Sequence, residues 1–124
     1  MSLSNFLELE LLDHVFAPAA YTAPTNIYCK LHTGDPGEDC TGNAATETTR
    51  IEDTFGTASS GAIVTDADAL WLAVAGAETY SHVSLWDDET AGNPLAYGAL
   101  VTPRAVLAGD DFTIDAGDLS VAFD

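Results

Sequence analysis

Positively charged side chains are almost absent from this 124-residue sequence. Lys30, Arg50 and Arg104 are its only lysine and arginine residues, against 20 aspartates and glutamates, and the formal net charge is −17. Nucleic acids and anionic membrane surfaces are bound through clustered cations that neutralise phosphates. The composition therefore argues strongly against nucleic acid or an anionic membrane as a partner.

Long hydrophobic runs are also missing. Every apolar stretch ends within a few residues, whereas a membrane-spanning helix needs about 20. The leucine-rich start has no Lys or Arg before its apolar part, and Glu8, Glu10 and Asp13 interrupt it. That is not the pattern of a signal peptide. We expect a chain without a membrane span that is made in a cytoplasm.

Cysteine is scarce, with Cys29 and Cys40 as the only two. One pair can form a single bridge, but it provides neither a disulfide framework nor the spacing of a zinc site. Cys29 fits a buried strand position, while Cys40 lies in a glycine-rich loop. We expect two separate thiols, and a mutual disulfide is the less favoured alternative.

Apolar residues and carboxylates are abundant. Hydrophobic residues make up 47% of the chain, enough for one domain with a real core. Repulsion between carboxylates destabilises a fold at low salt, but about 1 M salt shortens the screening length to about 3 Å. The charge is thus typical either of a halophilic source or of an ordinary acidic, soluble surface.

The first part of the chain has a helical period. Apolar residues recur on one face between residues 3 and 16, Ser2 or Ser4 can cap the helix, and the step from Ala17 to Pro18 ends it. The apolar positions are Leu3, Phe6, Leu7, Leu11, Leu12, Val15 and Phe16. We expect one N-terminal amphipathic helix that packs on the parent domain or docks on a neighbouring subunit.

From residue 26 onward the period is that of β-strands. Short apolar segments alternate with turns rich in Gly, Asn, Asp and Ser. The expected strands are residues 26–32, 50–55, 62–64, 69–74, 79–86, 95–100, 112–115 and 119–123. Seven or eight short strands predict a mainly β fold, an antiparallel β-sandwich or small barrel. We expect a single domain over residues 1–124 with its β-region at 26–124.

The long polar loop at residues 33–49 is the best candidate for a cation site. Asp35, Glu38 and Asp39 offer carboxylate oxygens, and Asp66 and Asp68 could join them. Calcium requires six to eight oxygen ligands, and the spacing of an EF-hand is absent. The signal for a metal is therefore weak, and no cofactor is expected.

Catalytic patterns are not evident. The three histidines, His14, His32 and His82, lie on a helix or on strands, and no G-x-S-x-G elbow accompanies them. Some Ser/His/Asp combination can always be drawn in a chain this rich in serine and acid, but without a signature it predicts nothing. We expect no catalytic residues and no enzyme activity.

Aromatic residues on the expected strands suit a second kind of site. Tyr80, Trp86 and Tyr97 could line a groove on which a sugar ring stacks. This would make the chain a carbohydrate- or receptor-binding module, with a host surface glycan as ligand. Aromatic side chains interleaved with small residues are more often core or subunit contacts.

Short segments along the chain follow one another in a characteristic order. They are residues 11–14, 21–25, 31–37 (LHTGDPG), 54–61, 82–87 (HVSLWD), 92–95 (GNPL), 97–100 (YGAL), 108–110 and 116–119. Their succession, more than any one of them, resembles a family of small virion proteins of tailed phages. Members are known as tail-fibre, minor tail or head-decoration proteins.

The resemblance implies a non-enzymatic structural component of a tailed double-stranded DNA virus, either a bacteriophage or a haloarchaeal virus. A capsid decoration or turret-like module is the first expectation, and a minor tail or tail-fibre-base protein is the alternative. We expect it in the virion as a homo-oligomer that contacts other capsid or tail proteins. The candidate assembly contacts are Leu3, Phe6, Leu7, Leu11, Val15 and Phe16.

The charge makes a prediction about salt. If repulsion between carboxylates limits stability, the melting temperature should climb steeply between about 0.1 and 2 M KCl, because salt screens the repulsion. Differential scanning calorimetry over this range measures it. A flat curve would remove the argument for a halophilic source.

Overall fold

Antiparallel pairing organises the chain in this computed structural model, which describes residues 1–123. These residues form one helix, α1 (Asn5–Phe16), and nine strands. The strands are β1 (Ser2–Leu3), β2 (Ile27–His32), β3 (Ile51–Asp53), β4 (Ala62–Val64), β5 (Ala69–Trp71), β6 (Glu78–Trp86), β7 (Pro94–Val106), β8 (Phe112–Ile114) and β9 (Ser120–Ala122).

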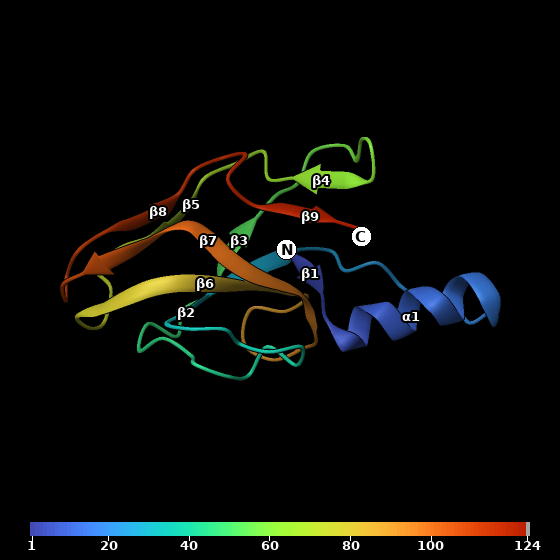
Figure 1. The fold of residues 1–124 in the computed structure, drawn as a ribbon, viewed down its shortest axis with the longest axis horizontal. Coiled ribbons are helices and arrows are strands. Elements are labelled where there is room, and N and C mark those ends of the chain that lie inside the picture. Colours follow the sequence, from blue (N-terminus) through green and yellow to red (C-terminus); the bar gives the residue numbers. More distant parts are fainter. Residues whose placement is uncertain (124) are drawn as a thin grey trace.

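One larger sheet and two ribbons form the layers. The sheet has five strands in the order β1-β7-β6-β2-β3, and the ribbons pair β4 with β9 and β5 with β8 (Figure 1). The pairings between these strands are all antiparallel. The predicted mainly β, sandwich-like fold with one N-terminal helix is confirmed. No helix within residues 1–123 is long and apolar enough to cross a membrane.

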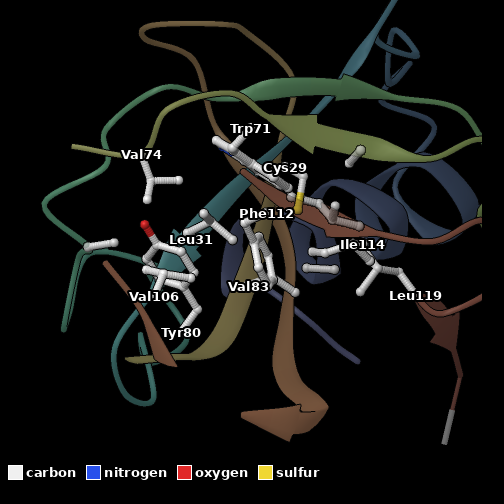
Figure 2. Packing of buried hydrophobic residues seen from close by; sticks show 14 of the residues in the cluster. Cys29, Leu31, Trp71, Val74, Tyr80, Val83, Val106, Phe112, Ile114 and Leu119 are labelled. Carbon is white, nitrogen blue, oxygen red and sulfur yellow. The ribbon is translucent and has the colours of Figure 1, made fainter. Parts of the chain in front are cut away.

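The core lies between the large sheet and the β5–β8 ribbon. Figure 2 shows Trp71 and Phe112 of the ribbon packed among residues of β2, β6 and β7. The ring of Phe112 meets Tyr80 edge-on at 5.1 Å between centroids and lies 5.8 Å from Trp71. Leu31 and Val83 are fully buried beside them. Burial of these large apolar surfaces is the main force that holds the two layers together.

The expected strands all occur at the expected places, although their ends differ. The largest difference is β7, which was expected at residues 95–100 and continues to Val106. Pro103 made the extension hard to foresee, because proline cannot donate to a sheet ladder. The ladder between β6 and β7 shifts register between Tyr80 and His82, so that residues 100–103 of β7 face only one residue of β6. Pro103 falls in this irregular stretch, where the ladder is already interrupted.

The start of the predicted helix was wrong by two residues. Leu3 lies in strand β1 and pairs with Ala96, so it is not helical. Ser4, one of the two expected caps, is the N-cap: its Oγ accepts a hydrogen bond from the N–H of Leu7 at 3.2 Å and donates one to the carbonyl of Pro94 at 2.6 Å. Because Ser4 must reach back to the sheet, the chain before it is extended.

Residues 33–49 fold back over the outer face of β2. The N–H of Thr33 donates to the carbonyl of Asn43 at 2.9 Å, and Cys40 is fully buried. Cys29 is buried as predicted, and Leu31 lies buried on the same inner face of β2. His32 on the other face is buried too, because this loop covers it. Both thiols are free in the described chain.

Substitution of leucine by alanine should change the stability of the protein more at a core position than on the exposed part of α1. Leu31→Ala removes a fully buried side chain and should cost about 2–5 kcal/mol of unfolding free energy. Leu12→Ala removes a side chain that is 54% exposed and should change it by less than about 0.5 kcal/mol. Urea denaturation measures both. Equal losses would mean that α1 packs on the domain.

Candidate functional site

Helix α1 is held to the domain at its first turn and projects from it thereafter. Ser4 is fully buried, and Phe6 and Leu7 pack against the core cluster. Beyond them no residue of α1 is buried, and Figure 1 shows the helix extending past the end of the sheets. The large apolar side chains on its exposed surface are Leu9 (64% exposed), Leu12 (54%), Val15 (66%) and Phe16 (80%).

Local signals explain why these residues are helical. Ser4 satisfies an N–H of the first turn, Glu8 lies near the positive end of the helix dipole, and His14 lies near the negative end. The helix ends where the N–H of Ala17 reaches the carbonyl of Asp13 at 3.0 Å. A 12-residue helix is marginal in water without packing. Beyond the contacts of Phe6 and Leu7, residues 1–123 bury none of α1, so its later turns lack the packing that such a helix needs.

A groove of about 640 Å³ runs between α1 and the ends of the sheets. Its wall on the helix side is apolar, and the opposite wall comes from β1, β7 and the C-terminal strand. The residues that line it are Ser2, Leu3, Glu8, Leu11, Leu12, Val15, Phe16, Glu38, Tyr97, Ala122 and Phe123.

Four of the six predicted assembly residues line this groove, namely Leu3, Leu11, Val15 and Phe16. Phe6 and Leu7 pack on the core instead, because the cap at Ser4 holds the first turn against β7. Sequence reasoning missed Tyr97 and Phe123 as members of this surface. Only the tertiary fold brings β7 and the C-terminus beside the helix, so no sequence signal could have found them.

The apolar surface continues beyond the groove. A second hollow of about 160 Å³ lies between β4 and β9, and it is lined by Ile63 and Val121 among other residues. Leu3, Ala122 and Phe123 line both hollows. One connected apolar surface therefore extends from α1 across β1 and β9 to β4. Monomeric proteins rarely leave such a surface in water, and it usually marks an interaction site.

Negative charge borders this surface. Glu8 and Glu38 line the groove, and no Lys or Arg of the described chain does so. The three cations are used elsewhere, over aromatic rings. The guanidinium of Arg50 lies 3.9 Å and the ammonium of Lys30 5.6 Å from the ring centre of Trp86, and Arg104 lies 5.8 Å from that of Phe112.

The predicted sugar-stacking aromatics do not gather on one surface. Tyr80 points into the core and is fully buried, because it lies on the inner face of β6. Trp86 is only 7% exposed: Arg50 covers its ring, and its N–H donates to Ser84 Oγ at 2.8 Å. Tyr97 alone of the three lines the apolar groove.

The acids proposed as metal ligands serve as hydrogen-bond acceptors in turns. Asp35 accepts from the N–H of Gly37 at 2.9 Å. Asp39 accepts from the hydroxyl and the N–H of Thr41, which lowers its pKa below the ordinary value. Glu38 lines the groove instead. Within residues 1–123 no three His, Cys, Asp or Glu side chains are arranged to hold a metal ion.

His32 and Ser84 form a buried pair that resembles a base and a nucleophile. His32 Nε2 lies 2.7 Å from Ser84 Oγ, and its Nδ1 lies 2.9 Å from the carbonyl of Gly42. A carbonyl only accepts, so Nδ1 carries the proton and Nε2 accepts from the serine hydroxyl. Both residues are fully buried, which denies a substrate access. The pair is best understood as a structural tie between the loop 33–49 and the sheet.

Burial shifts the pKa values of His32 and Asp53 in opposite directions. It lowers the pKa of His32 to about 4, because the charged imidazolium would be desolvated. It raises the pKa of Asp53 to about 6, with Asp66 and Asp68 adding to the rise. One oxygen of Asp53 accepts from the N–H of Thr54 at 2.8 Å, which opposes the rise, and the other accepts no hydrogen bond from the described residues.

Comparison with known proteins gives the setting for this surface. The sequence matches the model of a protein family, described as podophage GP4 fiber I protein gp80, over residues 2–122. The match covers almost the whole chain. A search of curated proteins gave no match.

The fold, the projecting helix and this match together define a structural protein of a tailed-phage particle. The chain belongs to the family of podophage GP4 fiber I protein gp80. The tailed-phage resemblance seen in the sequence and the expected location in the virion are thereby confirmed. Such a protein associates with other virion proteins.

The opposed pKa shifts make a testable prediction. Between about pH 6.5 and 4, His32 is neutral when folded but protonated when unfolded, so its contribution to stability falls as the pH drops. Between about pH 6 and 4, Asp53 is protonated when folded but ionised when unfolded, so its contribution rises as the pH drops. Each contribution is on the order of 3 kcal/mol, and they nearly cancel.

Single substitutions should uncover each contribution. Relative to the unmodified chain, Asp53→Asn should lose stability as the pH falls from 6.5 to 4, and His32→Gln should gain it over the same range. His32→Gln lowers stability at every pH, so the slope is the readout. Chemical denaturation at four or five pH values measures it. Parallel curves for all three proteins would show that neither group titrates as stated.

Proposed function

We propose that this chain is a tail-fibre-base protein, and that the connected apolar surface of α1, β1, β9 and β4 attaches it to its neighbour in the tail. The observation that carries the proposal is a helix of a virion protein with no buried residue and four large exposed apolar side chains. The description of its family as a fibre protein supports a place in the tail rather than on the capsid.

The rest of the molecule suits a structural role. The buried pair of His32 and Ser84 has no access to solvent, and Asp35 and Asp39 of the loop 33–49 accept hydrogen bonds within turns. The surface that remains free for a partner is apolar and continuous, as at permanent protein–protein interfaces.

The other expected roles gain less support. Capsid decoration, the first expectation from the sequence, has no observation in its favour beyond those that also fit a fibre. Glycan binding was expected to use Tyr80, Trp86 and Tyr97, and the first two of these rings are buried. A fibre role requires neither ligand nor metal.

Copy number and position in the particle test the proposal. Quantitative mass spectrometry against the major capsid protein should give a few to a few dozen copies, since tails and their fibres repeat far less often than capsid lattices. Immunogold labelling should mark the tail, with an antibody to the major capsid protein as the control. Hundreds of copies, or label spread over the capsid, would contradict a fibre role and establish decoration.

A further inference from the structure

We propose that the groove between α1 and β9 receives a basic amphipathic segment of a different virion protein, and not a second copy of this chain. The proposal rests on the proposed function only in that the chain is built into a particle. It adds the chemistry of the partner, which the family description does not give.

The shape of the groove fits an amphipathic segment. Leu12, Val15 and Phe16 stand at i, i+3 and i+4 and form one ridge along the helix. At about 1.5 Å per residue, the part of α1 that lines the groove, from Glu8 to Phe16, extends about 12 Å along the helix. Phe123 and Tyr97 form the facing wall. A partner helix with about two turns of apolar face would fill this space, as in other helix-in-groove complexes.

The charge around the groove selects a basic segment. Glu8 and Glu38 lie in its lining, and Asp13 lies on the exposed surface of the same helix. The ammonium of Met1 lies outside the lining and donates a hydrogen bond to the carbonyl of Ser120 at 2.8 Å. Lysine or arginine on the flanks of a partner would therefore meet carboxylates that the described chain leaves without a cation.

The same charges disfavour a second copy. A twofold contact through this groove would use the same patch on both chains, so Glu8 and Glu38 of each would enter one interface. Each chain also carries a net charge of −17. Like charges brought together in a contact cost several kcal/mol. The apolar ridge attracts any apolar partner, but its acidic border discriminates between partners.

Site-specific photo-cross-linking in intact particles tests the proposal. A benzophenone side chain at Leu12 lies in the groove, whereas Leu9 is at least as exposed on the helix but lies outside the lining. The Leu12 probe should give cross-links to a Lys- or Arg-rich peptide of another virion protein, and the Leu9 probe should give few. Cross-links from Leu12 to this chain itself, to an acidic peptide, or in equal yield from both positions would overturn it.

Peptide binding gives an independent readout with the purified chain. The probe is a fluorescent 18-residue helix with one leucine face and lysines on its flanks, and the control peptide has glutamate in place of lysine. The lysine peptide should bind at least about tenfold more tightly in 0.1 M NaCl. Leu12→Glu should weaken it at least about tenfold, since a buried leucine contributes about that much. Leu9→Glu adds the same charge outside the groove and should weaken it far less.

Equal effects of Leu12→Glu and Leu9→Glu would mean that the peptide is held by general attraction to an acidic protein, which would overturn the proposal. The cross-linking result can fail or succeed independently of the proposed fibre role. A cross-link from Leu12 to a basic segment of a capsid protein would support the groove while contradicting the fibre role. If the chain is located at the tail but Leu12 cross-links to a second copy of it, the fibre role would be supported and the groove proposal contradicted.

Discussion

The buried hydroxyl of Ser4 fixes the direction in which α1 leaves the sheet, and the candidate site depends on it. The hydroxyl donates to the carbonyl of Pro94 and accepts from the N–H of Leu7, while the N–H of Ser4 donates to the carbonyl of Leu95 at 2.9 Å. This anchors one end of α1 and commits its later turns to solvent. Without that constraint the apolar face could fold onto the domain, and the groove beside β9 would close.

A second constraint is the shortage of positive charge. The chain has only three Lys and Arg side chains, and each lies over an aromatic ring. Many carboxylates are held by backbone N–H groups in turns, as at Asp35 and Asp88. Such hydrogen bonds stabilise ionised carboxylates without a counter-ion. On the acidic surface that results, the apolar groove is the feature that can recognise a partner.

The sequence predicted the local structure well and the site only in part. Alternation and turn residues located eight strands, because each signal lies within a few residues. The helical period located α1 and singled out Leu11, Val15 and Phe16, which line the groove. The sequence could not reveal that Tyr97 and Phe123 complete the groove, that a loop covers His32, or that Tyr80 points into the core. Those facts depend on pairings between residues far apart in the chain, which no local pattern records.

The central claim is that the later turns of α1 are covered only in the assembled particle. Amide hydrogen exchange over residues 9–16, compared between the purified chain and intact virions, tests it most directly. An exposed, marginal helix should exchange rapidly when the chain is free, and burial against a partner should slow exchange at least about a hundredfold. The amides of β6 serve as the internal reference. Equal exchange in both states would show that the apolar face of α1 stays open in the virion and would contradict the claim.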